Sequence, residues 1–413
     1  MKHIKYLLVF TSLIYGCQPS ITEKNTPDKP SIKEIATPSE EGGEPNLFTS
    51  ETDRVYLSWI EYANDTTDVL MFSEFKDQNW MPAQTIATGH DWFVNWADFP
   101  SLVAYTDNGQ SFAAHWLQKS AEGTYDYDVK IAQSFDAGKT WTPAFIPHRD
   151  SISAEHGFVS MLPLSKDNIF ATWLDGRNTK SEKQETSGGH HGAMTLRSAI
   201  FDKAGNLFEE VELDNRICDC CQTSAALTDK GPIVAYRDRS KDEIRDIAVV
   251  RQVDGKWTNP SLVFKDNWHI TGCPVNGPSI AADKNFVAIA WFTMSNEKPE
   301  VKVAFSENSG QDFSQPIQVS NDNPLGRVDI ILLNENTALV SWLEKTDNTA
   351  EIKSVKVNSK GKIGESFLVA TTDGSRSSGF PIITRYNDQV LYAWTENKNG
   401  LSTVKSATLS LDN

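Results

Sequence analysis

Three of the five cysteines of the chain fall within four positions, in the stretch CDCC from Cys218 to Cys221, and another follows at Cys273. Thiolates bind soft or borderline metals such as copper(I) and zinc, and in an extended segment Cys218 and Cys220 would point to the same side. The spacing matches no closed zinc motif. Two disulfides, with three possible connectivities, are the structural alternative in an oxidising compartment, and free or redox-active thiols are a third.

Histidines could complete such a ligand set, because imidazole binds the same metals. The candidates are His156, His190, His191 and His269. Whether their side chains can meet the thiols depends on the elements that carry them.

One apolar pattern recurs seven times along the chain and indicates those elements. Its central aromatic residues, 51 to 63 positions apart, are Trp59, Trp116, Trp173, Tyr236, Trp291, Trp342 and Trp394. Each run is preceded by another apolar run and followed by an alternating one and a fourth short one, with no helical periodicity. Four short strands repeated seven times predict an all-β fold, a seven-bladed β-propeller of four-stranded antiparallel blades.

The last repeat ends after its third strand and needs a fourth. The segment KEIATPS, which begins at Lys33, resembles the fourth strands of the first and sixth repeats, AQTIATG and SFLVATT. We therefore expect an N-terminal strand at about residues 32–38 to complete the last blade by pairing near residues 401–409, so that no free edge is left.

The loops sort the reactive side chains onto one face of this fold. In a four-stranded blade, the loop from the second to the third strand and the loop into the next blade open on the same face. All four cysteines after Cys17 fall in these loops, as do six histidines: His90, His148, His156, His190, His191 and His269. The pattern predicts that thiols and imidazoles meet in a central funnel, as a copper or zinc site or as a small-ligand pocket.

The turn SFDAGKTW, from Ser134 to Trp141, carries a family resemblance, with a degenerate copy at residues 306–313. In it, Asp136 can bond the amides of its own turn, Gly138 permits a left-handed corner and Trp141 packs between strands. Over most of its length the chain resembles the Asp-box (BNR-repeat) β-propellers of the sialidase superfamily. The motif is structural and does not by itself imply sialidase activity.

The resemblance implies an alternative hypothesis, an exo-acting glycoside hydrolase of acidic glycans. Sialidases bind the substrate carboxylate with three arginines, use a Tyr backed by a Glu as nucleophile and an Asp as acid/base. The catalytic candidates are Asp175, Arg177, Arg216, Arg237 and Arg239, and Arg327 and Arg376 are further arginines on this face. The family's Phe-Arg-Ile-Pro motif is missing, and seven repeats differ from the six blades of sialidases, so the departures favour another kind of site.

The beginning of the chain indicates export. Lys2 and Lys5 precede an apolar run too short to span a bilayer, and the following Gly16 and Cys17 resemble the lipobox of bacterial lipoproteins, in which the cysteine is lipidated. An ordinary secretory signal cut nearby is the alternative. We expect a signal peptide at residues 1–16, lipidation at Cys17, a polar tether at 17–31 and the propeller at 32–413.

Charge narrows the range of partners. The chain has 39 Lys and Arg against 55 Asp and Glu, a net charge of −16, and no basic run with interleaved aromatic residues. Such a surface repels phosphate backbones, so we expect no nucleic-acid partner. The expected protein is a monomer on the bacterial cell envelope that binds a metal, a small ligand or a glycan in its funnel; a protein-binding scaffold would not explain the Cys/His clustering.

Overall fold

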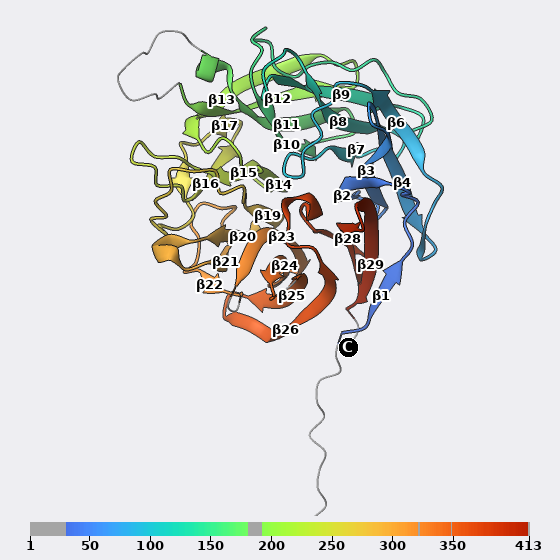
Figure 1. Ribbon diagram of the computed structural model, residues 1–413. Helices are drawn as coiled ribbons and strands as arrows, with labels where there is room; N and C mark the ends of the chain where they lie inside the picture. Colours follow the sequence, from blue (N-terminus) through green and yellow to red (C-terminus); the bar gives the residue numbers. More distant parts are fainter. Residues whose placement is uncertain (1–29, 181–191, 321–322, 348, 412–413) are drawn as a thin grey trace, which may run out of the picture.

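The computed structural model describes residues 30–180, 192–320, 323–347 and 349–411. Within these residues, seven antiparallel sheets stand around a common centre, as Figure 1 shows. The predicted seven-bladed β-propeller is therefore confirmed. The described residues include no helix long and apolar enough to cross a membrane.

The blades follow one another along the chain, and each begins with the strand nearest the centre. Blade one contains β2 (Gly42–Thr49), β3 (Val55–Asn64), β4 (Thr67–Lys76), β5 (Asn79–Trp80) and β6 (Gln84–Gly89). Blade two contains β7 (Ser101–Ala104), β8 (Phe112–Lys119) and β9 (Tyr127–Ser134). Blade three contains β10 (His156–Pro163), β11 (Asn168–Asp175), β12 (Met194–Asp202) and β13 (Leu207–Ile217).

The remaining blades repeat this order. Blade four contains β14 (Ser224–Thr228), β15 (Gly231–Arg237), β16 (Ile247–Val253), β17 (Lys256–Trp257) and β18 (Ser261–Leu262). Blade five contains β19 (Ser279–Asp283), β20 (Phe286–Thr293), β21 (Glu300–Ser306) and β22 (Ile317–Gln318). Blade six contains β23 (Pro324–Asn334), β24 (Thr337–Lys345), β25 (Ala350–Asn358) and β26 (Gly361–Thr372). Blade seven contains β27 (Ile382–Tyr386), β28 (Gln389–Lys398) and β29 (Leu401–Ser410), with β1 (Ile32–Ile35) at its outer edge. Three short 3-10 turns lie in loops: η1 (Arg177–Lys180), η2 (Ser295–Glu297) and η3 (Arg376–Ser378).

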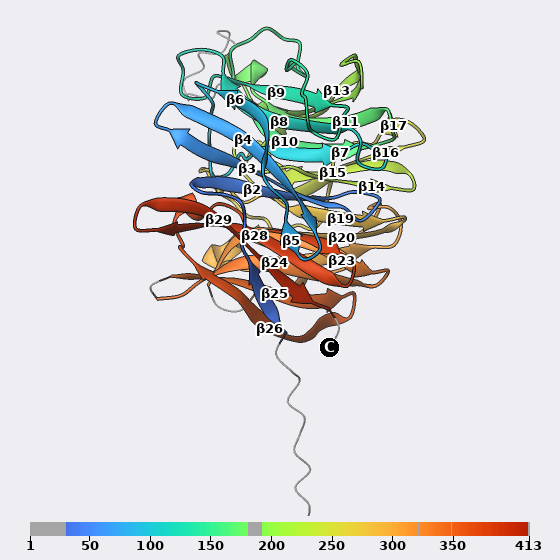
Figure 2. The ribbon, with the colours of Figure 1, turned by 90° about the vertical axis from the view of Figure 1, so that its right-hand side faces the viewer.

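The strand β1 closes the ring as the sequence predicts. It pairs antiparallel with β29, with Ile32 opposite Leu409 and Ile35 opposite Ser406. The two strands lie side by side at the edge of blade seven in Figure 1, and Figure 2 shows the chain running from β1 into blade one. The Thr37 hydroxyl extends the contact by donating to the Val404 carbonyl.

Blade two departs from the four-strand pattern. Its fourth strand is reduced to a single pairing, in which Ile131 and Phe145 exchange two main-chain hydrogen bonds of 2.9 Å. The surrounding segment contains Pro143 and Pro147, and proline has no N–H to donate to a sheet. The strand therefore cannot extend beyond this pair.

The repeated aromatic residues form the core of the blades. Each lies on the second strand of its blade, and all are buried: Trp59, Trp116, Trp173, Tyr236, Trp291, Trp342 and Trp394. In three blades the indole N–H donates to the acid two positions later, which lies on the same side of the strand. These pairs are Trp59 with Glu61, Trp173 with Asp175 and Trp342 with Glu344, at 2.6, 2.9 and 2.6 Å.

The turn after β9 has the geometry that its sequence predicts. Asp136 accepts hydrogen bonds from the N–H and hydroxyl of Thr140, and the Ser134 hydroxyl accepts one from the Gly138 N–H. Gly138 has a φ of +84°, and Trp141 packs on the aromatic cluster between blades one and two. In the degenerate copy at residues 306–313, the Ser306 hydroxyl accepts a hydrogen bond from the Gly310 N–H and donates one to Asn308. Asn308 stands in place of the aspartate and accepts a hydrogen bond from the Asp312 N–H, so both turns are built alike.

The seven inner strands enclose a central channel with a cavity of about 270 Å³. Its wall includes one or more residues from every blade: Phe48, Val103, Val159, Ala225, Ile280, Ile330 and Ile383. The buried Asp329 ties three blades together there, since its carboxylate accepts hydrogen bonds from the Ser279 hydroxyl and from the N–H groups of Ile330 and Ile383. The inner strands thus hold the loops of different blades close to one axis.

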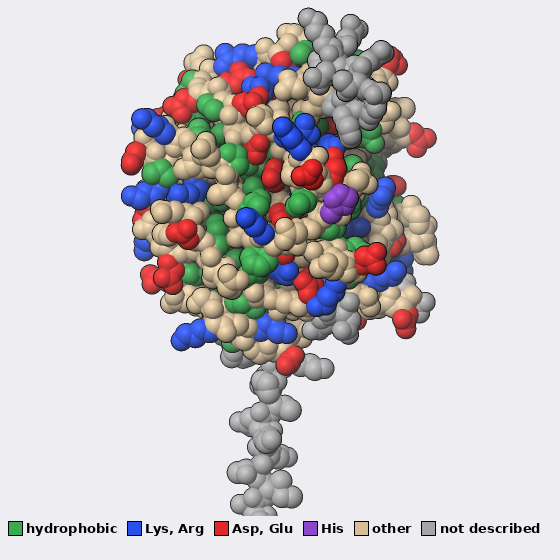
Figure 3. Space-filling view, turned by 90° about the vertical axis from the view of Figure 1, so that its left-hand side faces the viewer, with side chains coloured by type: hydrophobic (Ala, Val, Ile, Leu, Met, Phe, Trp, Pro, Cys, Tyr) green, Lys and Arg blue, Asp and Glu red, His purple; other side chains and the backbone are tan. Residues whose placement is uncertain are grey.

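The outer surface is mixed in charge where it can be seen from the side. Over the side that carries β16, β21 and β22, acidic and basic side chains intermingle and hydrophobic ones are scattered (Figure 3). Intermingled charge on this side provides no continuous basic track for a phosphate backbone.

Candidate functional site

Loops from five blades surround a cavity of about 360 Å³. They are the segments that enter blades two, three, four, five and seven, together with the connection from β8 to β9, and they contribute aromatic, acidic, basic and thiol side chains. The residues of the wall are Phe93, Asn95, Trp96, Ala97, Tyr125, Tyr127, Glu155, Phe158, Asp219, Cys220, Cys273, Val275 and Arg376. We call this space the loop-face cavity.

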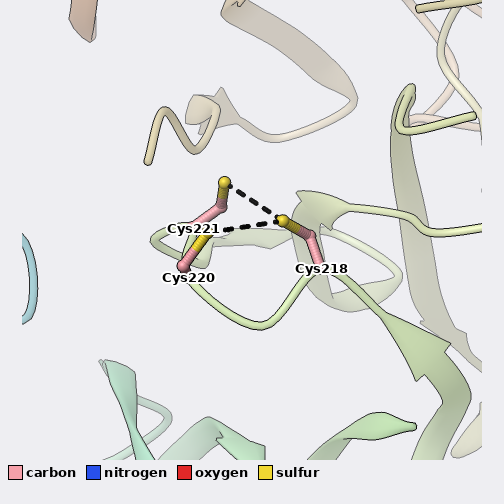
Figure 4. A group of neighbouring side chains, drawn as sticks. All are labelled: Cys218, Cys220 and Cys221. Carbon is pink, nitrogen blue, oxygen red and sulfur yellow. Dashed lines mark hydrogen bonds between the residues drawn. The ribbon is translucent and has the colours of Figure 1, made fainter. Parts of the chain in front are cut away.

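The thiols of the CDCC stretch converge at one side of this cavity. The Cys218 sulfur lies 3.4 Å from that of Cys221 and 3.8 Å from that of Cys220, and Figure 4 shows the side chains directed toward one another. All three sulfurs lie within 4.8 Å of one another. The Cys273 thiol interacts with that of Cys220, and both residues line the cavity.

Main-chain contacts hold this loop in place. The Cys218 N–H donates to the Arg237 carbonyl at the end of β15, and the Asn276 N–H donates to the Cys221 sulfur at 3.4 Å. The Arg245 guanidinium donates to the Cys218 sulfur at 3.2 Å. Burial opposes ionisation of this thiol, but hydrogen bonds from the neighbouring thiols and the charge of Arg245 outweigh it and hold the pKa of Cys218 well below its ordinary value.

The four cysteines that the structure describes form no disulfide, so the disulfide alternative is wrong. Cys218, Cys220, Cys221 and Cys273 are all free, and the separations of 3.4 and 3.8 Å far exceed the 2.05 Å or so of a sulfur–sulfur bond. Three of the four cysteines occupy one tight loop, and its geometry brings their sulfurs together without bridging to the next blade.

The predicted histidines do not join the thiols as one group. Among the described residues, the ligand clusters place His156 with His148 and carboxylates in a separate group. His269 is exposed, and its main chain pairs with Ile244. His190 and His191 lie outside the described residues, as do the predicted signal peptide at 1–16 and the predicted lipidation site Cys17.

Two of the candidate arginines on the loop face, Arg237 and Arg327, form buried hydrogen bonds within the fold. Arg237 is only 1% exposed, and its guanidinium donates to the carbonyls of Arg245, Asn276 and Phe292. Arg327 is also buried and donates to the Ser378 hydroxyl and to two carbonyls of the loop before blade seven. The guanidinium groups of Arg237 and Arg327 therefore already donate their hydrogen bonds to acceptors of the protein itself.

The other catalytic candidates are paired or lie apart from the cavity wall. Arg177 forms hydrogen bonds of 2.7 Å to both oxygens of Asp175, and Arg239 binds Glu243 and Asp219. Burial opposes ionisation of Asp175, but Arg177 and the nearby His156 hold its pKa below the ordinary value. Asp175 also repeats the indole-binding role of Glu61 and Glu344. Arg216 is half-buried, and its N–H bonds to Asp214.

Two side chains that the sequence did not single out, Tyr127 and Glu155, lie in the cavity wall. The Tyr127 hydroxyl donates to Glu155 at 3.0 Å and lies 3.2 Å from Asp98. Burial raises the pKa of Glu155 to about 8 and that of Asp98 to about 7. Arg376 is exposed in the same wall. No motif in the sequence marks Tyr127 or Glu155.

Solved structures share the fold at low sequence identity. A protein of unknown function from Dyadobacter fermentans matches with a TM-score of 0.54 and 12% identity, over 92% of this chain and 98% of its own. The polysaccharide lyase Uly1 matches with a TM-score of 0.51 and 10% identity, over 91% of each chain. The phage phi92 endosialidase also has a TM-score of 0.51 and 10% identity, over 93% of this chain and 70% of its own.

No protein-family description and no curated protein matches this sequence. At such low identity the structural matches establish the architecture alone. The chain is a β-propeller of the type that also occurs in a polysaccharide lyase and an endosialidase.

Proposed function

We propose that the loop-face cavity is a metal and small-ligand binding site, in which Cys218, Cys220 and Cys221 bind copper(I) or zinc and Cys273 approaches as a fourth thiol. The observation that carries the proposal is the convergence of three free sulfurs within 4.8 Å of one another. Thiolates that share an ion at bond lengths of about 2.3 Å lie about 3.5 to 4 Å apart, which agrees with the separations of 3.4 and 3.8 Å.

The surroundings suit a bound thiolate cluster. Arg245 supplies a positive charge and a hydrogen bond to Cys218, and such contacts stabilise thiolates around a metal. Soft thiolate ligands select copper(I) and zinc over harder cations. The aromatic and acidic wall of the cavity leaves space beside Cys220 and Cys273 for a ligand that reaches the metal.

Metal analysis of the full chain, purified without a His-tag, tests this proposal. We expect about one equivalent of copper or zinc, lost in Cys220→Ser, together with four free thiols besides Cys17 in denaturant once the metal is removed. Cys273→Ser separates two geometries: a three-thiol copper(I) site survives it, whereas a four-thiol zinc site does not. His90→Ala is the matched control, since His90 is exposed and bonds only to Thr66 and Thr67. Metal-free protein that takes up neither ion would refute the proposal.

Processing of an acidic glycan is the second candidate function. It is favoured by the Tyr127–Glu155 pair and the exposed Arg376 in one cavity wall, and by the Trp96 and Tyr125 rings beside them. Tyr127, however, is fully buried beneath the Phe93 ring, whose centroid lies 4.0 Å away, so the nucleophile of a sialidase-like reaction would have to be uncovered first. Degradation of acidic polysaccharides by the wild type but not by Glu155→Gln is the test.

We also propose that the chain is exported and lipidated at Cys17, which places the propeller on the bacterial cell envelope. The support is the sequence alone, in which an apolar run ends in Gly16 and Cys17. Expression of wild type and Cys17→Ser in a bacterial host, followed by detergent phase partition, checks it. Wild type should enter the detergent phase and the variant should not; equal partition of both would contradict lipidation.

A further inference from the structure

The four thiols at the loop-face cavity differ in how far solvent can reach them. Cys273 is exposed and Cys220 is half-buried, whereas Cys218 and Cys221 are each only 1% exposed. Cys220 and Cys273 line the cavity. An ion that comes from the cavity therefore meets these two sulfurs before it can reach the buried pair.

The sulfurs also form a continuous series of contacts from the cavity to the interior. The Cys273 thiol interacts with that of Cys220, whose sulfur lies 3.8 Å from that of Cys218. The Cys218 sulfur in turn lies 3.4 Å from that of Cys221 (Figure 4). An ion with bonds of about 2.3 Å to sulfur can bridge two sulfurs that are about 3.5 to 4 Å apart. It can therefore pass along this series while it keeps two sulfur ligands at each stage.

Hydrogen bonds fix the buried end of the series. The Arg245 guanidinium donates to the Cys218 sulfur at 3.2 Å, and the Asn276 N–H donates to the Cys221 sulfur at 3.4 Å. Cys273 precedes Asn276 by three positions in the same loop, and residues 271–273 are all exposed. One loop thus holds a buried thiol in place and presents another thiol to the cavity.

We propose that Cys273 is an entry thiol for copper(I), which takes the ion from a small complex in the cavity and passes it through Cys220 to Cys218 and Cys221. This inference rests on the proposed metal site and assigns copper(I) to it, because soft thiolates select this ion. The donor is a copper(I) complex with exchangeable thiol or thioether ligands, and the cavity of about 360 Å³ has room for them. Once three sulfurs hold the ion, Cys273 is free again.

Each step of the transfer exchanges one sulfur ligand for another. A bond from copper to the Cys273 sulfur forms as a bond to a donor ligand breaks, and Cys220 replaces the next donor ligand in the same way. Cys218 and Cys221 then bind the ion, and the bond to Cys273 breaks. Thiols that bind give their protons to the departing ligands or to water, and Cys273 takes one up when it leaves. Copper stays in the +1 state, so no oxidant or reductant is consumed.

The competing explanation is a site in which all four sulfurs stay bound to the metal, as in a closed four-thiolate zinc site. The two explanations differ in the state of Cys273 after loading. It is a free thiol if it serves entry, and it is a ligand if the site has four thiolates.

Alkylation by iodoacetamide distinguishes these explanations without any variant. Trypsin places Cys218, Cys220 and Cys221 in one peptide, residues 217–230, and Cys273 in another, residues 266–284. Native metal-free protein should be labelled in both peptides, because Cys220 and Cys273 are within reach of the cavity. Copper(I)-loaded protein should be labelled in peptide 266–284 alone. Protection of Cys273 by copper would overturn the entry role.

The rate of copper uptake tests the entry step itself. Metal-free full chain receives copper(I) as its coloured bicinchoninate complex, and the loss of colour is followed in time. Cys273→Ser should bind as many equivalents as the wild type but take them up about tenfold more slowly or less. His90→Ala, with its exposed histidine, should match the wild type. Equal rates in Cys273→Ser and wild type, or less copper bound by folded Cys273→Ser, would overturn the inference.

Failure of the entry role and failure of the metal site give different results. Wild-type protein that takes up no copper(I) refutes the metal site and the entry role together. Wild-type protein that binds copper(I), with Cys273→Ser loading at the same rate, keeps the metal site and removes the entry role alone.

Discussion

Buried charged residues in this propeller mostly connect main-chain segments. Arg237 lies at the end of β15 and binds carbonyls of two loops and of strand β20, while its guanidinium also stacks on the Trp268 ring at 4.8 Å. Loss of such a side chain leaves several buried acceptors without donors. A substrate-binding arginine, in contrast, keeps donors free toward a cavity, as the exposed Arg376 does.

This difference predicts opposite outcomes for two substitutions. Arg237→Ala should lower the free energy of unfolding by about 3 kcal/mol or more, because buried carbonyls lose their partners and a void opens beneath Trp268. Arg376→Ala should change it by less than about 0.5 kcal/mol. Chemical denaturation followed by tryptophan fluorescence measures both; a stable Arg237→Ala protein would show that the carbonyls find other donors.

The sequence predicted the thiol group better than the histidine group, for a geometric reason. Cys218, Cys220 and Cys221 are neighbours in one loop, so local geometry alone brings them together. His148 and His156 meet Asp128 only because β9 and β10 belong to adjacent blades, and nothing in the sequence marks Asp128 among the other acids of alternating strands. Tyr127 and Glu155 were missed for the same reason.

At the scale of single elements, β1 shows how a short strand can be predicted from the repeats of its own sequence. Its pattern alternates only weakly, with Lys33 and Glu34 exposed and Ile35 buried among residues of blades one and seven. The match to the fourth strands of other repeats identified it where hydrophobicity could not. The same comparison failed for blade two, because Pro143 and Pro147 interrupt a strand that the repeat pattern predicted.

Closure by β1 can be tested with a matched pair of substitutions. Ile35→Ala should lower the free energy of unfolding by about 2–5 kcal/mol, because it empties a site in the core between blades one and seven. Glu34→Ala, on the exposed side of the same strand, should change it by no more than about 0.5 kcal/mol. Urea denaturation monitored by circular dichroism gives both values, and equal, small effects would mean that β1 contributes little to the ring.

At the scale of the whole molecule, buried carboxyl groups set the dependence of stability on pH. Burial raises the pKa of Glu44 to about 7, of Asp98 to about 7 and of Asp329 to about 6. Between about pH 4 and 7 the unfolded chain has released these protons while the folded chain keeps them, so the unfolding free energy falls as pH rises. Asp150 and Asp175 act in the opposite sense, because their pKa values are lowered in the folded state. The stability that these two carboxylates contribute is lost as the pH falls below about 4 and they become protonated.

We therefore expect these carboxyl groups to reduce stability as pH rises from about 4 to 7, against the gain from His115 and His148, whose pKa values burial lowers to about 3. Glu44→Gln should reduce that loss by up to about 3 kcal/mol, since a shift from about 4.5 to 7 corresponds to that free energy. Urea denaturation of both proteins at pH 5 and pH 8 measures the difference. A change in stability between pH 5 and pH 8 that is the same in both proteins would show that Glu44 ionises freely in the folded state.

The pairing of Ile32–Ile35 with Ser406–Leu409 has a consequence for the order of events during synthesis. Blade seven cannot be completed until residue 409 has left the ribosome, although the strand that completes it is made first. A chain that is still being made therefore carries β1 unpaired while six blades form behind it, and the edge of β29 is the last to be covered. Ring closure over some 370 residues is entropically slow, so a chaperone that shields this edge would act at the final step of folding.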